Sequence, residues 1–225
     1  MKQGRALIAG VLCLNLTAAV RAADAGSEWE ADFPTLAAPQ QVYFRAEYRD
    51  NVGRTHELEA WREADRRLRR RTDAALDLYV EKSGPGEYLY RLIDHDRKIL
   101  IHADRTTLYR IGIFSDWVGL AHVLNVPRGG YRVTQASRQS PAALRGECVW
   151  KRLELTMPFP STSEICWSSR WGLPLEIGAI DENHGWNPRF SVQEVRTFAP
   201  EPQIFSISPE GLVEIDAGPN GEISD

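Results

Sequence analysis

Residues 68–80 read LRRRTDAALDLYV, and the alternation in this stretch decides the fold class. One face of the stretch is apolar apart from Arg70 and Thr72, whereas the other is charged or polar for most of its length. A period of two is typical of a β-strand with one buried face. We therefore expect one long strand over residues 68–80, in a sheet that packs on one side and meets water on the other. The residues of the apolar face are Leu68, Arg70, Thr72, Ala74, Leu76, Leu78 and Val80.

The same alternation recurs on both sides of this stretch. It predicts strands at residues 42–49, 56–62, 88–94, 98–101, 131–135, 147–155, 163–168, 173–180 and 189–198. A sheet of about nine or ten long antiparallel strands curls instead of staying flat. The predicted fold is α+β and mainly β: a curved antiparallel half-barrel with one or two helices that cover the concave face.

In the middle of the chain the apolar period changes to that of a helix. Ser115 is a suitable N-cap, and Pro127 ends the pattern shortly after Asn125. We expect an amphipathic helix over residues 115–125 and a further helical segment around residues 105–111. The apolar residues at helical spacing are Trp117, Leu120, Ala121 and Leu124.

The N-terminus has the three-part pattern of a secretory signal peptide. Lys2 and Arg5 precede the uncharged residues 6–20, and small side chains allow cleavage after Ala22. An uncleaved anchor is the alternative, although a membrane span needs about 20 apolar residues. The whole chain has 27 basic and 31 acidic residues; cleavage would remove three basic residues and no acid, which changes the net charge from −4 to −7. This balance argues against a nucleic-acid partner. The signal peptide predicts export, most simply to a bacterial periplasm.

We divide the rest of the chain into three parts and expect one disulfide bond within it. Residues 23–41 form a lead-in in which Glu28-Trp29-Glu30 starts a short helix, residues 42–198 form one β domain, and residues 199–225 form an extended acidic tail. Without Cys13, which lies in the signal peptide, the two remaining cysteines are Cys148 and Cys166. An even pair in an exported chain predicts a disulfide, with a redox or metal pair as the alternative.

Five segments in this order resemble the LolA-like superfamily of periplasmic outer-membrane lipoprotein carriers. They are THELEAWREADRRLRRRTD (55–73), YLYRLIDH (88–95), LYRIGIFSDWVGLAHVL (108–124), ECVWKRLEL (147–155) and EICWSSRWGLPLEIG (164–178). The resemblance covers about residues 42–198. It implies a half-open barrel whose mouth is covered by helices and whose cavity holds acyl chains. A sensor domain that binds lipoproteins in an envelope-stress pathway shares this fold. The arginine cluster and the cysteine pair are not features that a carrier requires.

Two groups of residues are the predicted contacts of a ligand or partner. Apolar side chains facing the concave side would line the cavity: Leu76, Leu78, Tyr90, Leu92, Trp117 and Leu120. Basic side chains would contact a lipid headgroup or an acidic partner: Arg67, Arg69, Arg70 and Arg71. The alternative for the arginines is a solvated face paired with Glu57, Glu59 and Glu63. Arg70 differs because it lies on the apolar face, where a charge must be paired or lie at the mouth of a cavity.

No motif for catalysis, phosphate binding or a cofactor occurs in the sequence. Asp94, His95, Asp96 and His102 suggest a metal site but are better explained as polar residues in and near a turn, so we predict no bound metal. Residues 216–225 resemble a calcium loop and are better explained as an acidic tail. We therefore predict a non-enzymatic, exported protein that binds an acyl chain, lipid or lipoprotein. The alternatives are an envelope-stress or envelope-assembly protein that acts through protein contacts and, third, a hydrolase.

Overall fold

The computed structural model describes residues 25–104, 117–127, 129–138, 146–156, 160–181, 185–199 and 201–217. Within these residues it contains two α-helices, α1 (Ala25–Asp32) and α3 (Trp117–His122), and one 3-10 turn, η2 (Pro202–Phe205). The strands are β1 (Gln41–Arg49), β2 (Thr55–Glu63), β3 (Arg67–Thr72), β4 (Leu76–Gly84), β5 (Glu87–Asp94), β6 (Ile99–Ala103), β7 (Tyr131–Gln135), β8 (Val149–Leu155), β9 (Ser161–Ser168), β10 (Leu173–Asp181), β11 (Gly185–Arg196) and β12 (Val213–Asp216).

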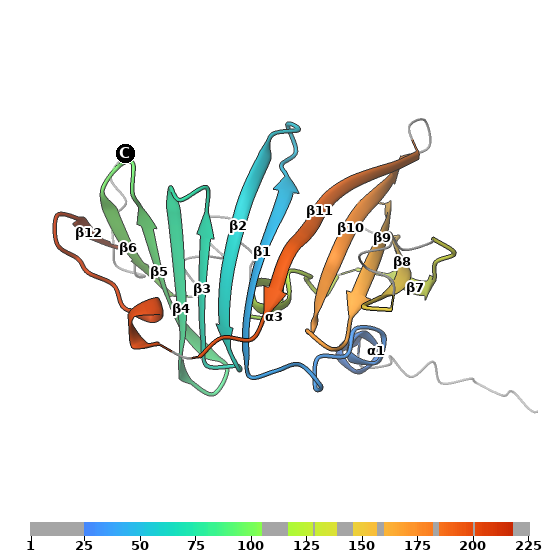
Figure 1. Cartoon of the computed structure of the whole chain (residues 1–225), viewed down its shortest axis with the longest axis horizontal. Helices are drawn as coiled ribbons and strands as arrows, with labels where there is room; N and C mark the ends of the chain where they lie inside the picture. Colours follow the sequence, from blue (N-terminus) through green and yellow to red (C-terminus); the bar gives the residue numbers. More distant parts are fainter. Residues whose placement is uncertain are drawn as a thin grey trace, which may run out of the picture.

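All twelve strands belong to one open sheet in the order β12-β6-β5-β4-β3-β2-β1-β11-β10-β9-β8-β7 (Figure 1). Neighbouring strands are antiparallel except β12, which runs parallel to β6. Strand β11 returns beside β1 and so joins the two halves of the chain into one sheet. The predicted mainly β, largely antiparallel fold class is confirmed.

The predicted single strand over residues 68–80 is wrong, because the structure places a turn in its middle. Asp73 and Ala74 have positive φ angles of 51° and 55°, and strands β3 and β4 pair with each other on either side of them. Thr72 and Leu76 are direct partners, so the alternation continues in phase through the hairpin. The predicted division into two faces therefore holds although the single strand does not.

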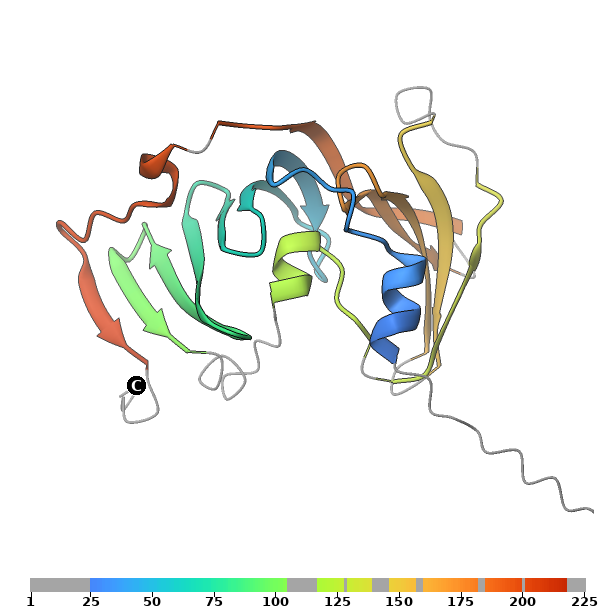
Figure 2. The same cartoon turned by 90° about the horizontal axis from the view of Figure 1, so that it is seen from below.

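The sheet forms an arch, and both helices lie inside it (Figure 2). Helix α3 packs through Trp117, Leu120 and Ala121 on a buried row of the β3–β5 region. Helix α1 packs through Trp29 and Phe33 on the β8–β9 region. Of the predicted helix over residues 115–125, α3 forms residues 117–122, and the predicted extension to Asn125 is wrong, because the helix ends at His122 and Val123 has a positive φ angle of 59°. Ser115 and the segment at 105–111 lie outside the described residues. The short helix predicted at Glu28-Trp29-Glu30 is confirmed as part of α1.

The C-terminal segment packs on the outer, convex face. Ile207 and Leu212 contact a cluster formed by Tyr79, Ile93 and Leu100. From there the chain continues into β12 at the edge of the sheet. Within the predicted tail, residues 202–216 thus carry η2 and β12. No helix in the described part of the chain is both long and apolar enough to span a bilayer.

Candidate functional site

One row of side chains crosses the concave face from β3 to β12. The strand register pairs Arg70 with Leu78, Leu78 with Leu92, Leu92 with Ile101, and Ile101 with Ile215. Directly paired residues point to the same face, and each strand adds about 4.8 Å, so the row is about 19 Å long. It is apolar from Leu78 to Ile215 and has a guanidinium at its other end. We call these five residues the concave row.

The concave row lies between two rows of different character. On one side, Leu68, Val80 and Tyr90 are buried under α3. On the other side, Leu76 and Val213 are exposed by 40% and 63%, and this outer row also contains Asp94. Leu78, Leu92 and Ile101 are half-buried, and Ile215 is 36% exposed. The concave row is therefore a strip of partly accessible apolar surface beside a packed core.

The structure places the six predicted cavity residues in three different surroundings. Tyr90, Trp117 and Leu120 come together in one buried cluster, where the ring of Trp117 stacks on that of Tyr88 at a centroid distance of 5.0 Å. Leu78 and Leu92 belong to the concave row, and Leu76 belongs to the outer row. Sequence reasoning missed Ile101 and Ile215 as members. Alternation within residues 98–101 could have indicated Ile101, but no local signal pairs β12 with β6.

Arg70 is the charged end of the concave row. Its side chain lies between Ala60 on β2 and Leu78 on β4, and burial lowers the pKa of its guanidinium. Among the described residues, no hydrogen bond or ion pair to this guanidinium is found. Asp94, on the same face, accepts a hydrogen bond from the backbone N–H of Arg97 at 2.9 Å and lies 3.7 Å from Nε of Arg97. Arg70 thus places a positive charge within a largely apolar, partly buried surface, where Tyr48 is an ionisable group that interacts with it.

The other three predicted arginines lie on the convex face and are paired with carboxylates. Arg69 Nε and Nη2 donate to the two carboxylate oxygens of Asp77, each at 3.0 Å. Arg71 Nε donates to Asp77 at 3.3 Å, and Arg67 Nε donates to Glu63 at 2.7 Å. Asp77 is 1% exposed; burial opposes its ionisation, but the hydrogen bonds from Arg69 and its other partners hold its pKa below the usual value.

The C-terminal segment covers these convex arginines. The carbonyl oxygen of Ile204 accepts a hydrogen bond from Arg69 Nη1 at 3.2 Å. The guanidinium of Arg67 lies 4.6 Å from the centroid of the Phe205 ring. The arginine cluster is therefore split, since β3 directs Arg70 inward and directs its neighbours toward carboxylates and the chain's own C-terminal segment.

A second buried arginine fastens α3 to the sheet. Arg62 Nη1 donates to the carbonyl of Ala121 at 2.9 Å, and Arg62 Nη2 donates to the carbonyl of Trp171 at 2.8 Å. Burial lowers its pKa to about 10. Burial and the nearby Arg62 charge lower the pKa of His122 to about 4. Both side chains, with Trp117, line a pocket of about 290 Å³ at one end of the arch.

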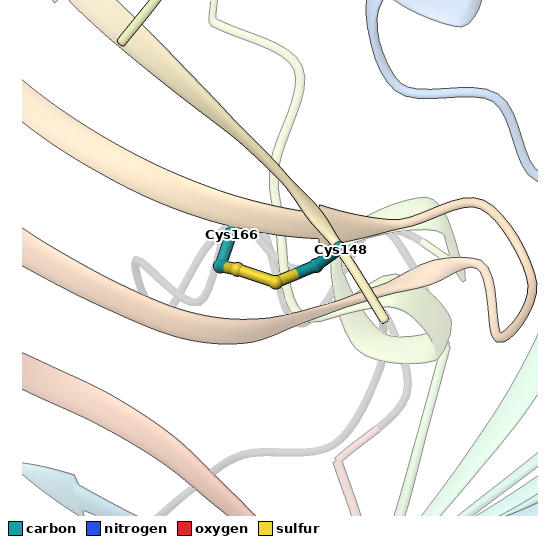
Figure 3. The surroundings of a disulfide bond; sticks show 2 residues. All are labelled: Cys148 and Cys166. Carbon is teal, nitrogen blue, oxygen red and sulfur yellow. A yellow bond between two sulfur atoms is a disulfide. The ribbon is translucent and has the colours of Figure 1, made fainter. Parts of the chain in front are cut away.

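Cys148 and Cys166 form the predicted disulfide, with their Cα atoms 5.3 Å apart (Figure 3). It links the residue that precedes β8 to the middle of β9. The described residues contain no group of three side chains that could hold a metal ion. Within the same residues, the histidines contact carboxylates (His56, His95 and His102) or Arg62 and a carbonyl (His122), and none contacts a hydroxyl or a thiol.

These observations define the class of the fold and of the site. The fold is an open, arched, mainly antiparallel sheet with helices inside the arch. The site is a partly accessible apolar strip on its concave face that ends at Arg70, whose guanidinium has no ion pair with another described residue.

Comparison with known proteins gives distant structural similarities alone. No protein family and no curated protein matches the sequence. A crystal structure of MucB is similar over 84% of this chain, with a TM-score of 0.43 and 16% identity. A complex of Pseudomonas aeruginosa MucA and MucB gives a TM-score of 0.43 with 17% identity over 83% of this chain, and MucB in complex with MucA(peri) gives 0.39 with 17% identity over 85%. The chain spans 65%, 62% and 62% of the length of these three chains.

Proposed function

We propose that this chain is an exported, non-enzymatic binding protein that holds an acyl chain of a lipid or lipoprotein on the concave face of its sheet. The observation that carries the proposal is the concave row, whose apolar side chains keep part of their surface accessible beside the packed core. Each methylene group that moves from water onto such a surface contributes about 0.8 kcal/mol. Binding by this means makes and breaks no covalent bond.

The width of the row favours a single hydrocarbon chain over a helix. Neighbouring rows on a strand are about 6.6–7 Å apart, whereas a helix with its side chains is about 10–12 Å wide. A helix on the concave row would therefore also lie over the outer row and its carboxylate, Asp94. A single acyl chain needs only the strip between α3 and the outer row.

The proposal is tested with a matched pair of substitutions in β5. Leu92 faces the concave row, whereas Leu89 is 50% exposed on the opposite face of the same strand. We expect the delipidated protein to bind a pyrene-labelled fatty acid saturably in a fluorescence titration. Leu92→Ser should weaken binding about tenfold, a loss of about 1.4 kcal/mol, and Leu89→Ser should leave it unchanged. A wild-type protein that takes up no probe would refute the proposal.

A second candidate function is that of an envelope-stress or envelope-assembly protein that acts through protein–protein contacts, as MucB forms a complex with MucA. The observation that favours it is the edge strand β12, whose four residues are all exposed. Val213 and Ala217 donate their backbone N–H groups to residues 98 and 102 on the β6 side, so the N–H of Glu214 points outward. An outward row of backbone groups can accept a strand from another protein.

Glu214→Pro separates the two candidates. Proline removes an outward N–H group and no backbone hydrogen bond to β6, but it also removes the contact between the Glu214 carboxylate and Nε2 of His102 at 3.0 Å. If the chain acts by strand addition, this substitution should abolish capture of the partner and leave uptake of the acyl probe intact. Capture that persists at the wild-type level would rule out strand addition at β12.

A further inference from the structure

The arginines on β3 and in the turn before it pair with carboxylates, with one exception. Arg66 and Arg67 pair with Glu63, whereas Arg69 and Arg71 pair with Asp77. Arg70 alone in this run has no carboxylate partner in the described part of the chain. Carboxylates are therefore placed beside every neighbouring arginine but not beside the one that faces the apolar surface.

An unpaired guanidinium on an apolar surface is unfavourable for folding. Its charge loses water on burial, and no ion pair or hydrogen bond from a described residue compensates for that loss. A methionine or leucine at this position would fill similar space at lower cost. The position of Arg70 is explained if an anion that is absent from the folded chain itself completes its environment.

The concave row indicates which chemical group is attached to that anion. The half-buried Leu78, Leu92 and Ile101 follow Arg70 in a straight cross-strand line, and Ile215 of β12 is the last residue. A ligand that satisfies the whole row has one negative end and an unbranched apolar body. This inference rests on the proposed acyl-binding function and adds the chemistry of the headgroup to it.

We propose that the concave row is a binding site for a single-chain anionic amphiphile, with Arg70 as the residue that recognises its carboxylate or phosphate. The hydrocarbon chain lies along Leu78, Leu92 and Ile101 toward Ile215. The guanidinium donates charge-assisted hydrogen bonds to the anionic oxygens and excludes a cationic headgroup from the same place.

The experiment compares two headgroups on the same twelve-carbon chain. Dodecanoate and dodecyltrimethylammonium, both below their micellar concentrations, compete with the neutral fluorescent probe N-phenylnaphthylamine for the delipidated protein. We expect wild-type protein to bind dodecanoate at least about tenfold more tightly than the cation. The same competition with dodecyl phosphate shows which headgroup the site prefers. The preferred headgroup, phosphate or carboxylate, is the one that displaces the probe at the lower concentration.

Substitutions assign the preference to Arg70. Arg70→Met should remove the preference for dodecanoate, Arg70→Lys should keep most of it, and Arg66→Gln, which removes an arginine charge at an exposed turn, should not change it. Arg70→Met should also raise the urea midpoint of unfolding, because it removes an unpaired charge. A merely structural arginine would give a lower midpoint instead, so this measurement distinguishes the two roles.

The outcomes separate this inference from the function on which it rests. If neither amphiphile displaces the probe, the acyl-binding function fails and the inference fails with it. If both amphiphiles displace the probe equally and Arg70→Met changes nothing, acyl binding stands and the role of Arg70 is overturned. A lower urea midpoint for Arg70→Met, with an unchanged headgroup preference, overturns it as well and shows that Arg70 has a structural role within the folded chain.

Discussion

At the scale of single residues, the position on the sheet decides what each arginine does. Arg62 and Arg70 both lie on the concave face, but Arg62 donates to three carbonyl oxygens and Arg70 to no described group. Alternation in the sequence was enough to place Arg70 on the apolar face. Alternation could not distinguish Arg62 from Arg70, because the carbonyl groups that bind Arg62 lie in α3 and in the turn before β10. Both segments are far from Arg62 in the sequence.

His56 is the residue for which we predict a pH dependence. Its Nδ1 lies 2.6 Å from an Asp73 carboxylate oxygen, and its Nε2 lies 3.3 Å from one of Asp50, so it joins two hairpin turns. The hydrogen bond with Asp73, and then that with Asp50, raises the pKa of His56. Burial opposes ionisation of Asp50, but hydrogen bonds from the Arg54 backbone, His56 and others lower its pKa to about 2.

The direction of the effect follows from these shifts. A raised histidine pKa contributes stability below the ordinary value of 6.5, and this contribution disappears as the pH rises through the folded-state pKa. The lowered aspartate pKa contributes above the ordinary value of 3.8. We expect His56→Gln to lower the urea midpoint more at pH 5.5 than at pH 8.5. Equal losses at the two pH values would contradict this interpretation.

At the scale of elements, the β3–β4 hairpin shows what alternation can and cannot predict. Positive φ angles at Asp73 and Ala74 turn the chain, yet neither residue is glycine, so little in the local sequence indicated the turn. The turn nevertheless preserves the phase of the alternation, since Thr72 pairs directly with Leu76. The faces were predictable for this reason, whereas the number of strands was not.

The same hairpin has a buried ionic centre at Asp77. We expect Asp77→Asn to destabilise the protein by about 3–5 kcal/mol, because it leaves the Arg69 and Arg71 charges without their shared carboxylate. The matched control is Asp65→Asn, which removes an exposed partner of Lys82 and should cost at most about 1 kcal/mol. Urea unfolding of the three proteins measures both values. Equal effects of the two substitutions would show that burial does not strengthen the Asp77 cluster.

At the scale of the whole molecule, the arch is held by contacts between distant parts of the chain. Strand β11 pairs with β1, and the disulfide fastens β9 to the chain that enters β8. The disulfide favours a location outside the cytoplasm. The signal peptide at residues 1–22 and its cleavage after Ala22 stay predictions, which N-terminal sequencing of the exported protein would check.

The disulfide also makes a prediction for overall stability. Cys148 and Cys166 are 18 positions apart, and a crosslink over a loop of this length contributes about 3 kcal/mol in the chain-entropy account. The double variant Cys148→Ser/Cys166→Ser should lose about that much in urea unfolding under oxidising conditions. Reduction of the wild-type protein with dithiothreitol should give a similar loss. A double variant as stable as the oxidised wild type would exclude this role.

The sequence by itself determined the mainly β fold class, the sides on which side chains lie, the α1 and α3 regions and the cysteine pair. Each of these depends on neighbours along the chain or on the composition of an exported protein. Only the tertiary structure decided that Arg67, Arg69 and Arg71 pair with carboxylates while Arg70 pairs with none in the described part of the chain. It alone also made Ile215 the last residue of the concave row. The physical reason is that ion pairs and cross-strand rows depend on register between strands, and a period of two within one strand carries no information about which strand lies beside it.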